Sequence, residues 1–571
     1  MKIYQFWQKI IILFILLWIY LLLVNINRKR QEADDIFEEN LKEKLTNVLL
    51  ELDNLHKNNV ELKQQVIGLT QRLRIFKNSN SKQKQLNGPS EDYELLRRRI
   101  YSNMKEFWYY ISFELQLLAT SVKKKLPFII HMKTTIDEHY RSLLNDIDKL
   151  TEVDGYAQWR RKEYIYLSTL VKKRIRILQN PQDCSKAKKL ACNLISDHRS
   201  CGYGCRLHHL VNCMVVAYAT KRTLVLDNPH NWGFTSDGFT SLFFPLSNIC
   251  TSINRNETVL PWPGDESVQV VNLSLPITEL GGPNREQKPQ PKPFNPLILP
   301  EDLSHRLNVL HGDPAVWLIG QFVNYIIRPQ ISTIDIFEIY ENFFEFSGPV
   351  VGVHIRRTDN ISPFHTLEEY MYHVEDYYKL QESNGIFNPK KIYLATDDPT
   401  LFNEAYDKYP EYQILGDAEL SETESVKSRE LDNSIMNINI DIYFLSRCDY
   451  LVCTFSSHVC RLAYEIMNGI KFEDASAQFA SLDDVYYFNN QIRRLNVAVL
   501  PHKANGPQEM DLQVGDEIEV INNLWNGYSK GINLRTNKSL LYPTFKVTQK
   551  MEIMSFTSYP DIKISAEELE E

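Results

Sequence analysis

The sequence predicts an α/β body that lies between a helical N-terminal part and a small C-terminal barrel. From Asp183 onward, short apolar runs such as Thr223–Leu226, Val350–Val353 and Lys391–Thr396 alternate with helix-like runs. This alternation is typical of a domain with a mainly parallel sheet. Before Asp183 the chain is helical in pattern, and after residue 505 it has short strands separated by turns. With 571 residues the chain is longer than a single domain usually is.

An apolar run near the N-terminus, Ile10–Val24, predicts an uncleaved signal anchor. The run is framed by Lys9 and by Arg28–Arg30, and its flanking residues bring it toward the ~20 residues of a spanning helix. A cleaved signal peptide and a buried core helix are the alternatives, although no small-x-small cleavage site follows the run. Basic residues on both sides leave the orientation open by the positive-inside rule.

Cysteine usage and sequons predict an oxidising compartment. Cys448 stands apart from two cysteine clusters, which consist of Cys184, Cys192, Cys201, Cys205, Cys213 and Cys250, and of Cys453 and Cys460. Disulfides are typical of such compartments, and the CGYGC motif lacks the second cysteine pair of a zinc knuckle. Glycosylation sequons begin at Asn256, Asn272, Asn360 and Asn537. The net charge of −8 does not suggest a nucleic-acid binder.

Two segments outside the α/β body have signatures of their own. Apolar residues in alternating steps of four and three run from Leu41 to Phe76, with Asn59 at an a position, and predict a parallel coiled-coil homodimer. A single long stalk helix is the alternative. The C-terminal runs VGDEIEV, WNG and LYPTFKV resemble an SH3 barrel. Such barrels usually bind proline-rich ligands; a docking or dimer-supporting module is the alternative here.

Polar residues follow three of the expected strands and mark a candidate site. They are His354–Asp359, Thr396–Asp398 and Thr454–Ser457. In open α/β sheets, ligands bind at the carboxyl ends of the strands. The sole Asp-x-Asp motif, Asp146–Asp148, lies in the helical region, so a sugar nucleotide would be held at its diphosphate by arginine rather than by a metal. Because side chains alternate along a strand, we expect one residue of the Arg356–Arg357 pair to meet the diphosphate and the other to ion-pair within the fold.

The same residues also have plainer interpretations. Both arginines could be structural or solvated. Ser456 and Ser457 can cap the helix that follows them, or the N-terminus of that helix could meet an anion. The carboxylates of Asp397 and Asp398 are expected either to bind ribose, base or sugar hydroxyls or to form an ordinary turn.

Six runs together resemble the eukaryotic alpha-1,6-fucosyltransferases of N-glycan core fucosylation. The runs are VHIRRTD, FHTLEEYM, YLATDDP, CTFSSHVCRLAYEIM, HGDPAVW and CGYGC, and the resemblance extends from about Cys184 to Val547. It implies a Rossmann-like, GT-B-like body and an inverting, metal-independent transfer of fucose from GDP-fucose to the 6-hydroxyl of the innermost GlcNAc, without a cofactor. It also implies a single-pass type II protein of the Golgi membrane whose catalytic domain is luminal and whose partner is the N-glycan of a glycoprotein.

With this resemblance, each part of the chain has an expected role. The segments are a cytosolic tail (1–9), a transmembrane anchor (10–27), a coiled-coil stem (31–77), a linker (78–90), a helical stem region (91–180), the catalytic domain (183–500, with a nucleotide-binding part at about 348–470), an SH3-like domain (505–552) and a C-terminal tail (553–571).

The resemblance also assigns roles to single residues. It places the diphosphate on Arg356, the guanine on His354 and Asp441, and a second nucleotide-binding arginine at Arg429. Further donor-site positions are Arg357, Asp359, Asp397, Asp398, Ser457 and Cys460. The cysteine pairing of the family implies the disulfides Cys184–Cys250, Cys192–Cys213, Cys201–Cys205 and Cys453–Cys460, which leaves Cys448 free.

One loop departs from the family pattern. After Asp359 the family has a lysine and then a glutamate that is taken as the base for the acceptor proton; here Asn360 replaces the lysine, the loop is shorter and the glutamate is absent. Asp359 and His365 are the candidate bases, and Arg356 and Asp359 are the expected catalytic residues. His458 also stands where glutamine is common. An active transferase is therefore weighed against a donor- or glycan-binding pseudoenzyme, a transferase with another acceptor, and a structural Golgi protein.

Overall fold

The computed structural model describes most of the chain from Gly88 onward, and these residues belong to one unit, Gly88–Glu571. Residues not described are 1–87, 122–125, 195–201, 228–234, 236–237, 255–256, 265–266, 275–293, 358–363, 425–431, 489–493, 558, 560–561, 566–567 and 569–571. The predicted anchor and coiled coil therefore lie outside the described residues. Among the residues that are described, no helix is both long enough and apolar enough to cross a membrane.

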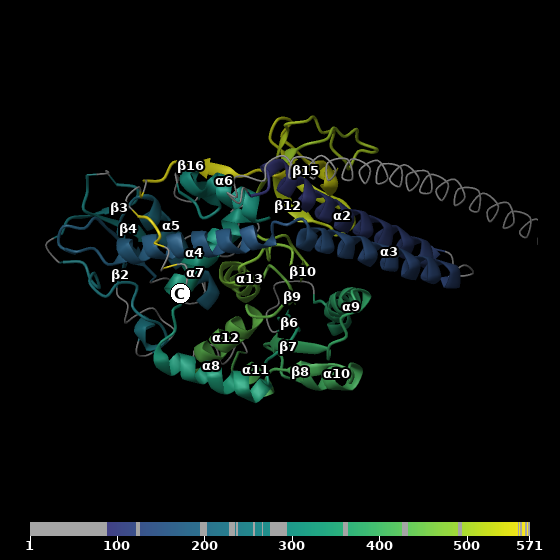
Figure 1. Cartoon of the computed structure of the whole chain (residues 1–571), viewed down its shortest axis with the longest axis horizontal. Helices are drawn as coiled ribbons and strands as arrows, with labels where there is room; N and C mark the ends of the chain where they lie inside the picture. Colours follow the sequence, from purple (N-terminus) through teal and green to yellow (C-terminus); the bar gives the residue numbers. More distant parts are fainter. Residues whose placement is uncertain are drawn as a thin grey trace, which may run out of the picture. The chain divides into compact units, whose positions relative to one another are not determined.

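Three long helices begin the unit, and buried ion pairs join two of them. They are α2 (Glu91–Ser121), α3 (Leu126–Val153) and α4 (Ala157–Gln179), and α2 and α3 pack side by side (Figure 1). The Glu94 carboxylate of α2 is buried and accepts a 2.8 Å hydrogen bond from Arg160 of α4. Arg97 also pairs with Glu94, at 2.9 Å. Because a buried carboxylate is costly without a cation, the Glu94–Arg160 pair helps to hold α2 against α4.

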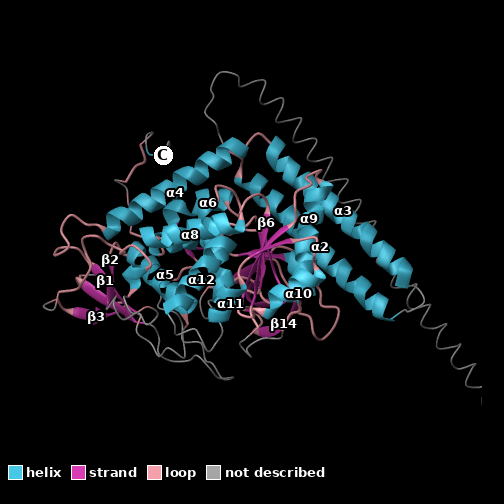
Figure 2. Ribbon diagram, turned by 90° about the horizontal axis from the view of Figure 1, so that it is seen from below, coloured by secondary structure: helices cyan, strands magenta, loops and turns pink. Residues whose placement is uncertain are grey.

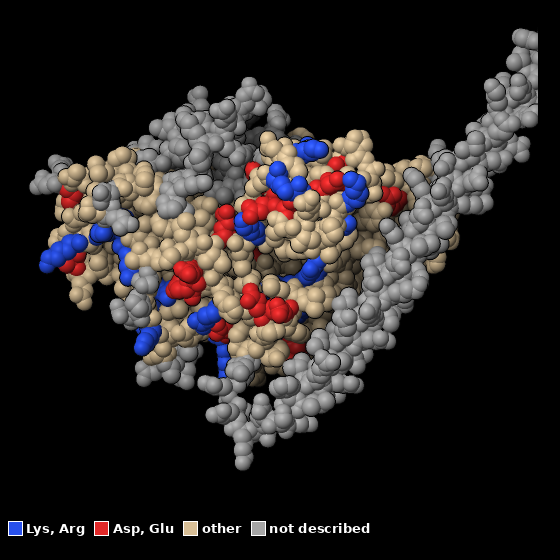
Figure 3. All heavy atoms as spheres, turned by 90° about the horizontal axis from the view of Figure 1, so that it is seen from above, with Lys and Arg blue, Asp and Glu red and all other residues tan. Residues whose placement is uncertain are grey.

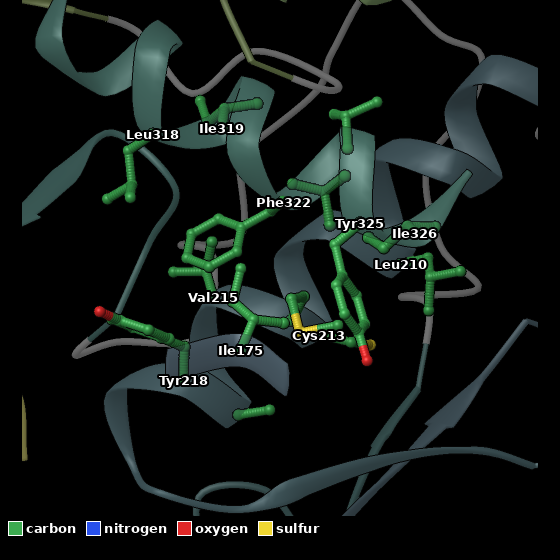
Figure 4. Packing of buried hydrophobic residues seen from close by; sticks show 14 of the residues in the cluster. Ile175, Leu210, Cys213, Val215, Tyr218, Leu318, Ile319, Phe322, Tyr325 and Ile326 are labelled. Atoms are coloured by element: carbon green, nitrogen blue, oxygen red, sulfur yellow. The ribbon is translucent and has the colours of Figure 1, made fainter. Parts of the chain in front are cut away.

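The first of the two larger parallel sheets in the described residues has the strand order β2-β1-β4-β3. Its strands are β1 (Lys189–Asn193), β2 (Thr223–Asp227), β3 (Val259–Pro261) and β4 (Val270–Ser274). Helix α5 (Tyr203–Ala219) is buried along its whole length, and α7 (Pro314–Ile326) along nearly all of it. Side chains of these two helices, among them Val215 and Phe322, interlock in the main core (Figure 4). Helices that are apolar on all sides are typical of the centre of a large protein.

The second parallel sheet has the order β10-β9-β6-β7-β8 and helices on both faces. Its strands are β6 (Val350–Ile355), β7 (Lys391–Thr396), β8 (Gln413–Leu415), β9 (Tyr450–Cys453) and β10 (Phe479–Ser481). One face packs against α8 (Ile331–Phe344), α11 (Ala418–Glu424), α12 (Asp432–Leu445) and α13 (His458–Ile470), and the other against α9 (Leu367–Ser383) and α10 (Thr400–Lys408). The predictions of a mixed α/β fold with parallel sheets and of strands at Val350, Lys391 and Tyr450 are confirmed.

Helices α7 and α13 cross with their backbones in contact. A side chain at Gly320 of α7 would lie 2.2 Å from the Glu465 carbonyl oxygen, and one at Gly469 of α13 would lie 2.6 Å from the Gly320 carbonyl carbon. Gln321 donates a 2.8 Å hydrogen bond to the Gly469 carbonyl across the crossing. The two glycines are therefore required by close approach, and they join the helices of the two parallel sheets.

An antiparallel sheet follows, in the order β14-β13-β12-β11-β15. Its strands are β11 (Leu495–Ala498), β12 (Glu517–Asn523), β13 (Tyr528–Asn533), β14 (Lys538–Pro543) and β15 (Val547–Gln549). The run LYPTFKV is not one strand, because the 3-10 turn η4 (Thr544–Lys546) separates β14 from β15. Gly527, with φ of 86°, lies against Tyr110 of α2, where a side chain would come within 2.8 Å. The sheet therefore docks on α2 through a turn that only glycine fits.

The last part of the chain returns to the first half of the unit. Strand β16 (Glu552–Met554) pairs in parallel with β5 (Ile298–Pro300), which precedes α6 (Glu301–Leu310). Beyond it, Phe556 and Tyr559 enter the main core, where the Tyr559 hydroxyl donates a 2.6 Å hydrogen bond to the Tyr218 carbonyl of α5. The segment predicted as a C-terminal tail is thus partly built into the core.

The Glu106 carboxyl, buried between α2 and the antiparallel sheet, gives a pH-dependent prediction. Burial raises the pKa of Glu106 from 4.5 to about 7, although Asn523 donates a 3.4 Å hydrogen bond to it. The unfolded chain ionises this group first, so stability falls as pH rises from about 4.5 to about 7. We expect Glu106→Gln to stabilise the unit by about 1–3 kcal/mol above pH 7 and to change nothing below pH 4.5. Thermal unfolding at pH 4.5 and 8, with the exposed Glu138→Gln as control, tests this; equal shifts at both pH values contradict it.

Charges of both signs are mixed on the surface. On the face shown in Figure 3, lysine and arginine side chains lie next to aspartate and glutamate side chains. Figure 2 shows the strands β1, β2 and β3 at one end of the unit and β6 at a distance from them, surrounded by helices. The mixed face differs from the basic stripe that a nucleic-acid-binding domain presents.

Candidate active site

Three strands of the second sheet end at the same edge. In register, Ile355 of β6 pairs with Thr396 of β7, and Val353 pairs with Val452 of β9. The residues that follow these strands, Arg356, Asp397 and Thr454, therefore share the carboxyl edge of the sheet. This is the edge where ligands bind in parallel α/β sheets, and it brings together the three polar stretches that the sequence singles out.

The two arginines after β6 have different surroundings. Arg357 lies two positions after Ile355, whose side chain packs against α9 and α10. Nη1 of Arg357 lies 3.3 Å from Glu404 of α10 and 3.5 Å from Asp398. Its backbone N–H donates a 2.7 Å hydrogen bond to Asp397. Arg357 is thus the arginine that ion-pairs within the fold. Arg356 has an exposed side chain, and the alternation of side chains along a strand predicts that it lies on the other face of the sheet from Arg357.

His354 lies at the buried end of this edge. It is 5 % exposed, and its Nδ1 has no hydrogen-bond partner among the residues described. Burial lowers the pKa of His354 to about 4, an effect that the charge of Asp397 partly offsets and that of Arg356 reinforces. The imidazole is therefore neutral at physiological pH. A neutral ring with one unpaired nitrogen is suited to a directional hydrogen bond with a neutral ligand group.

Ser457 occupies the N-cap position of α13 without acting as a cap. Its side chain makes no capping bond, it is 2 % exposed, and its Oγ has no partner among the described residues. Of the alternatives that the sequence left open for Ser457, the structure shows no side-chain cap. Since burying an unpaired hydroxyl costs about 1–3 kcal/mol, this oxygen is placed for a ligand that approaches the helix N-terminus.

The N-termini of two helices meet beside Ser457. Helix α5 begins after Gly202, and a side chain at Gly204 would lie 2.6 Å from Cβ of His458, the first residue of α13. Each helix N-terminus carries a partial positive charge. Their convergence, together with Arg356, makes this part of the edge favourable for an anion such as a diphosphate.

Disulfides hold both of these helix starts. Cys453 of β9 is disulfide-bonded to Cys460 of α13, so Cys460 has a structural role in the loop between β9 and α13. The other two bonds in the described residues are Cys184–Cys250 and Cys192–Cys213, and all three are those that the resemblance implies. Cys205 of α5 is also disulfide-bonded, while its expected partner Cys201 lies outside the described residues. Cys448 is free and buried.

His365 lies where α9 begins, directly after the loop that departs from the family. Its Nδ1 is 3.4 Å from the Glu369 carboxylate, and its Nε2 is buried without a partner among the described residues. Its ring is edge-on to that of Tyr370, whose hydroxyl is hydrogen-bonded by Thr454 at the end of β9. His365 therefore belongs to the carboxyl edge, with one nitrogen oriented by a carboxylate.

The remaining predicted residues have different surroundings. The Asp441 carboxylate, buried on α12, accepts a 2.6 Å hydrogen bond from the Tyr393 hydroxyl of β7. The Asp398 carboxylate accepts the backbone N–H and hydroxyl of Thr400 at 3.1 and 2.6 Å, which is the ordinary turn that the sequence left open. Asp359 and Arg429 lie outside the described residues, so their roles stay predictions.

A hydrogen-bonded group behind α13 was not foreseen from the sequence. His208 of α5 contacts both His458 and Glu465 of α13, and Tyr486 donates to Glu465. The signal available was weak: Glu465 lies seven residues after His458, hence on the same helix face, but nothing in the sequence places His208 next to them.

A large cavity lies at the other end of the same sheet. It has a volume of about 690 Å³ and is lined by residues of α2, by Tyr450 at the start of β9 and by Phe545 of the 3-10 turn η4. Since β9 starts there rather than ends there, this cavity is distinct from the carboxyl edge and contains none of the predicted site residues.

Comparison with known proteins identifies the family of this chain. The family model of alpha-(1,6)-fucosyltransferase N- and catalytic domains matches residues 1–487. The chain belongs to the alpha-(1,6)-fucosyltransferase family. It is 43 % identical over 488 residues to the Drosophila melanogaster alpha-(1,6)-fucosyltransferase, covering 83 % of this chain and 76 % of the relative. It is 34 % identical over 452 residues to the Caenorhabditis elegans alpha-(1,6)-fucosyltransferase, covering 77 % and 78 %.

As a member of this family, the chain is a glycosyltransferase. Solved structures similar to this alpha-(1,6)-fucosyltransferase family member include fucosyltransferase NodZ from Bradyrhizobium, at 13 % identity and a TM-score of 0.29 over 48 % of this chain and 92 % of that one. A mutant of Arabidopsis thaliana FUT1 in complex with GDP matches at 14 % identity and a TM-score of 0.32, over 57 % and 76 %.

Proposed function

We propose that this protein transfers fucose from GDP-fucose to the 6-hydroxyl of the innermost GlcNAc of N-glycans, with inversion and without a metal ion. The observation that carries the proposal is the anion-binding arrangement at the carboxyl edge of the second sheet. There the exposed Arg356 accompanies the unpaired Ser457 Oγ and two converging helix N-termini. Family membership supplies the sugar and the linkage.

Each group at this edge has a part in the proposed reaction. As the glycosidic bond breaks, the diphosphate gains negative charge, and the planar guanidinium of Arg356 offsets it in place of a metal. Ser457 Oγ donates to a phosphate oxygen. His354 Nδ1 and the Asp441 carboxylate bind the guanine, and the remaining edge residues bind the sugar. His365 takes the proton of the attacking hydroxyl as its oxygen bonds to the anomeric carbon.

The proposal extends to the setting of the enzyme. We infer a GT-B-like arrangement of the two parallel sheets, an SH3-like barrel for the five-stranded antiparallel sheet, and a luminal Golgi location behind the N-terminal anchor. The disulfides within the described residues support an oxidising compartment. The heptad pattern supports a homodimer through the stem.

The direct test is fucose transfer by the full-length protein. The detergent-solubilised chain would be incubated with GDP-fucose and a GlcNAc-terminated biantennary N-glycan, with and without EDTA, and the products analysed by fragment mass spectrometry. We expect a gain of one deoxyhexose on the innermost GlcNAc in both samples. Loss of product with EDTA contradicts the metal-free mechanism, and a deoxyhexose elsewhere contradicts the acceptor.

The absent loop glutamate favours a second candidate function. Between Asn360 and Phe364 the chain has no acidic residue that could act as a base. A protein that binds GDP-fucose or glycan without turnover would show calorimetric GDP binding but no product in the same assay. That pair of results would favour the pseudoenzyme.

A further inference from the structure

The cavity of about 690 Å³ at the start of the second sheet is built by segments that are far apart in the chain. It is lined by α2, the loop between α6 and α7, α9, the start of β9, the segment after α13, the turn η4 and β15. All of these segments belong to the unit Gly88–Glu571. The volume is within the range of about 300–1,000 Å³ that is usual for small-molecule sites.

A buried histidine has an unpaired donor at the wall of this cavity. His311 lies in the loop between α6 and α7 and is 0 % exposed. Its Nδ1 accepts a 2.9 Å hydrogen bond from the Asp313 N–H, so the hydrogen of the neutral ring is on Nε2. Burial lowers the pKa of His311, so the ring is neutral at physiological pH. This Nε2–H has no hydrogen-bond partner among the described residues.

The Asp474 carboxylate lies beside this donor and has an acceptor position left. Its Oδ1 is 3.8 Å from Nε2 of His311, which is too far for a hydrogen bond. The carboxylate accepts hydrogen bonds from the Gly312 N–H at 3.0 Å and from the N–H and hydroxyl of Ser476 at 3.1 and 2.6 Å. Since a carboxylate has about four acceptor positions, one is open. His311 and Asp474 both line the cavity.

A hydroxyl group placed between His311 and Asp474 satisfies both side chains at once. Its oxygen accepts from His311 Nε2–H, and its hydrogen is donated to the Asp474 carboxylate. A deprotonated anion has no hydrogen to donate to the carboxylate, and an ammonium group cannot accept from the imidazole. A water molecule can make the same two bonds, and a ligand hydroxyl can replace it. The pair therefore favours a ligand that carries hydroxyl groups.

The charged side chains around the cavity favour a ligand without charge. Four arginine or lysine residues and four aspartate or glutamate residues line it, so the charges balance. Two of the cations are also engaged within the fold: Arg98 donates to the Val309 carbonyl at 3.0 Å, and Lys471 donates to the Gln478 side chain at 2.5 Å. A nucleotide or a sulfated chain would be attracted by a basic patch, which this lining does not form.

Aromatic rings and open polar groups complete the lining. The rings are those of Tyr101, Tyr377, Tyr450 and Phe545. Tyr377 stacks on Tyr450 with 5.2 Å between the ring centroids. The hydroxyl of Tyr377 and the side-chain amides of Asn103 and Gln381 have no hydrogen-bond partner within the part of the chain that is described. A sugar ring has C–H groups that pack on aromatic rings and hydroxyls that bind to such polar groups.

We propose that this cavity is a carbohydrate-binding site, separate from the donor edge, which takes an uncharged sugar residue of a glycan with one hydroxyl between His311 and Asp474. The inference goes beyond the proposed function, because binding here requires neither GDP-fucose nor the hydroxyl that would be fucosylated. A glycan held in this cavity leaves the carboxyl edge of the sheet unoccupied.

Photoaffinity labelling of the full-length protein tests where the sugar binds. The probes are two neutral biantennary N-glycans, one ending in GlcNAc and one in galactose, each with a diazirine on a terminal sugar. GDP is present in excess. We expect labelled peptides from residues 95–103, 377–381 and 471–478, and we expect unlabelled neutral glycan to compete. Absence of label from these three segments with both probes would overturn the inference, and stronger competition by a sulfated oligosaccharide would overturn the ligand class.

Variants of the lining provide the second readout. Asn103 is half-buried on α2, and Asn103→Trp should fill the cavity and lose most of the labelling. Gln116→Trp, at an exposed position of the same helix outside the cavity, should label like the wild type. Tyr377→Phe removes one hydroxyl and should weaken competition by unlabelled glycan about two- to tenfold. Equal labelling of wild type and Asn103→Trp contradicts the site, whereas loss of fucose transfer with labelling intact contradicts the proposed function alone.

Discussion

Replacement of Arg356 by alanine is expected to weaken GDP-fucose binding by at least about 100-fold and to abolish turnover. Each hydrogen bond between charged groups contributes about 1.5–3 kcal/mol, and a guanidinium can make two to a diphosphate. The side chain of Arg356 is exposed at the carboxyl edge, and its charge helps to lower the pKa of the nearby His354. Calorimetric titration with GDP-fucose and the transfer assay measure the two effects.

The neighbouring arginine is a matched control for this change. Arg357 has the same charge but pairs with Asp398 and Glu404. Arg357→Ala should lower the thermal midpoint while leaving donor affinity within about fivefold of the wild type, because exposed and half-exposed ion pairs contribute about 0–1 kcal/mol. If Arg357→Ala loses donor binding and Arg356→Ala keeps it, the roles of the two arginines are reversed.

The second large effect is expected at His365. We expect His365→Asn to lower kcat by about 10²–10⁴-fold, the usual contribution of a general base, without changing the affinity for GDP-fucose. If Glu369 accepts the Nδ1 hydrogen across the 3.4 Å contact, Nε2 is the nitrogen that takes a proton. The transfer assay at saturating GDP-fucose measures kcat, and calorimetric titration with GDP-fucose measures the donor affinity.

Two further variants separate His365 from its neighbours. Glu369→Gln should reduce kcat by about tenfold only, since the Glu369 carboxylate orients the His365 ring and does not touch the acceptor. The second carboxylate oxygen of Glu369 also accepts a 2.6 Å hydrogen bond from the Thr366 N–H. Asp359→Asn should lower kcat far less than His365→Asn does. A large loss of kcat in Asp359→Asn, with His365→Asn unaffected, would identify Asp359 as the base.

The strands at the site were predictable because each can be identified from its own residues and those next to it. Val350–Val353 and Ile392–Ala395 are short strand-like runs, and each is followed by the polar residues that mark the carboxyl edge. The alternation of side chains along β6 also predicted that the two arginines would separate, and Arg357 meets α10 accordingly. These inferences need only neighbouring residues.

Other features of the site depend on contacts between distant parts of the chain. His208 and His458 are 250 positions apart, and no local pattern places their rings together. Ser457 has the sequence of an ordinary helix cap, and only the structure shows that its oxygen turns away from that role. Asn523 of the antiparallel sheet likewise reaches Glu106 of α2 across 417 positions. Pairings of this kind depend on the whole topology.

The return of the chain's end to the main core has a consequence for synthesis on the ribosome. Tyr559 fills a place against Tyr218 that was translated 341 positions earlier. At about 5–20 residues per second, the first parallel sheet must wait roughly 20 to 70 s for this part of its packing. During that interval the nascent chain exposes an apolar surface around α5 that its own later residues will cover. Premature termination anywhere before Phe556 would therefore leave the core around α5 incomplete, although the sequence of α5 and of the first parallel sheet is fully present.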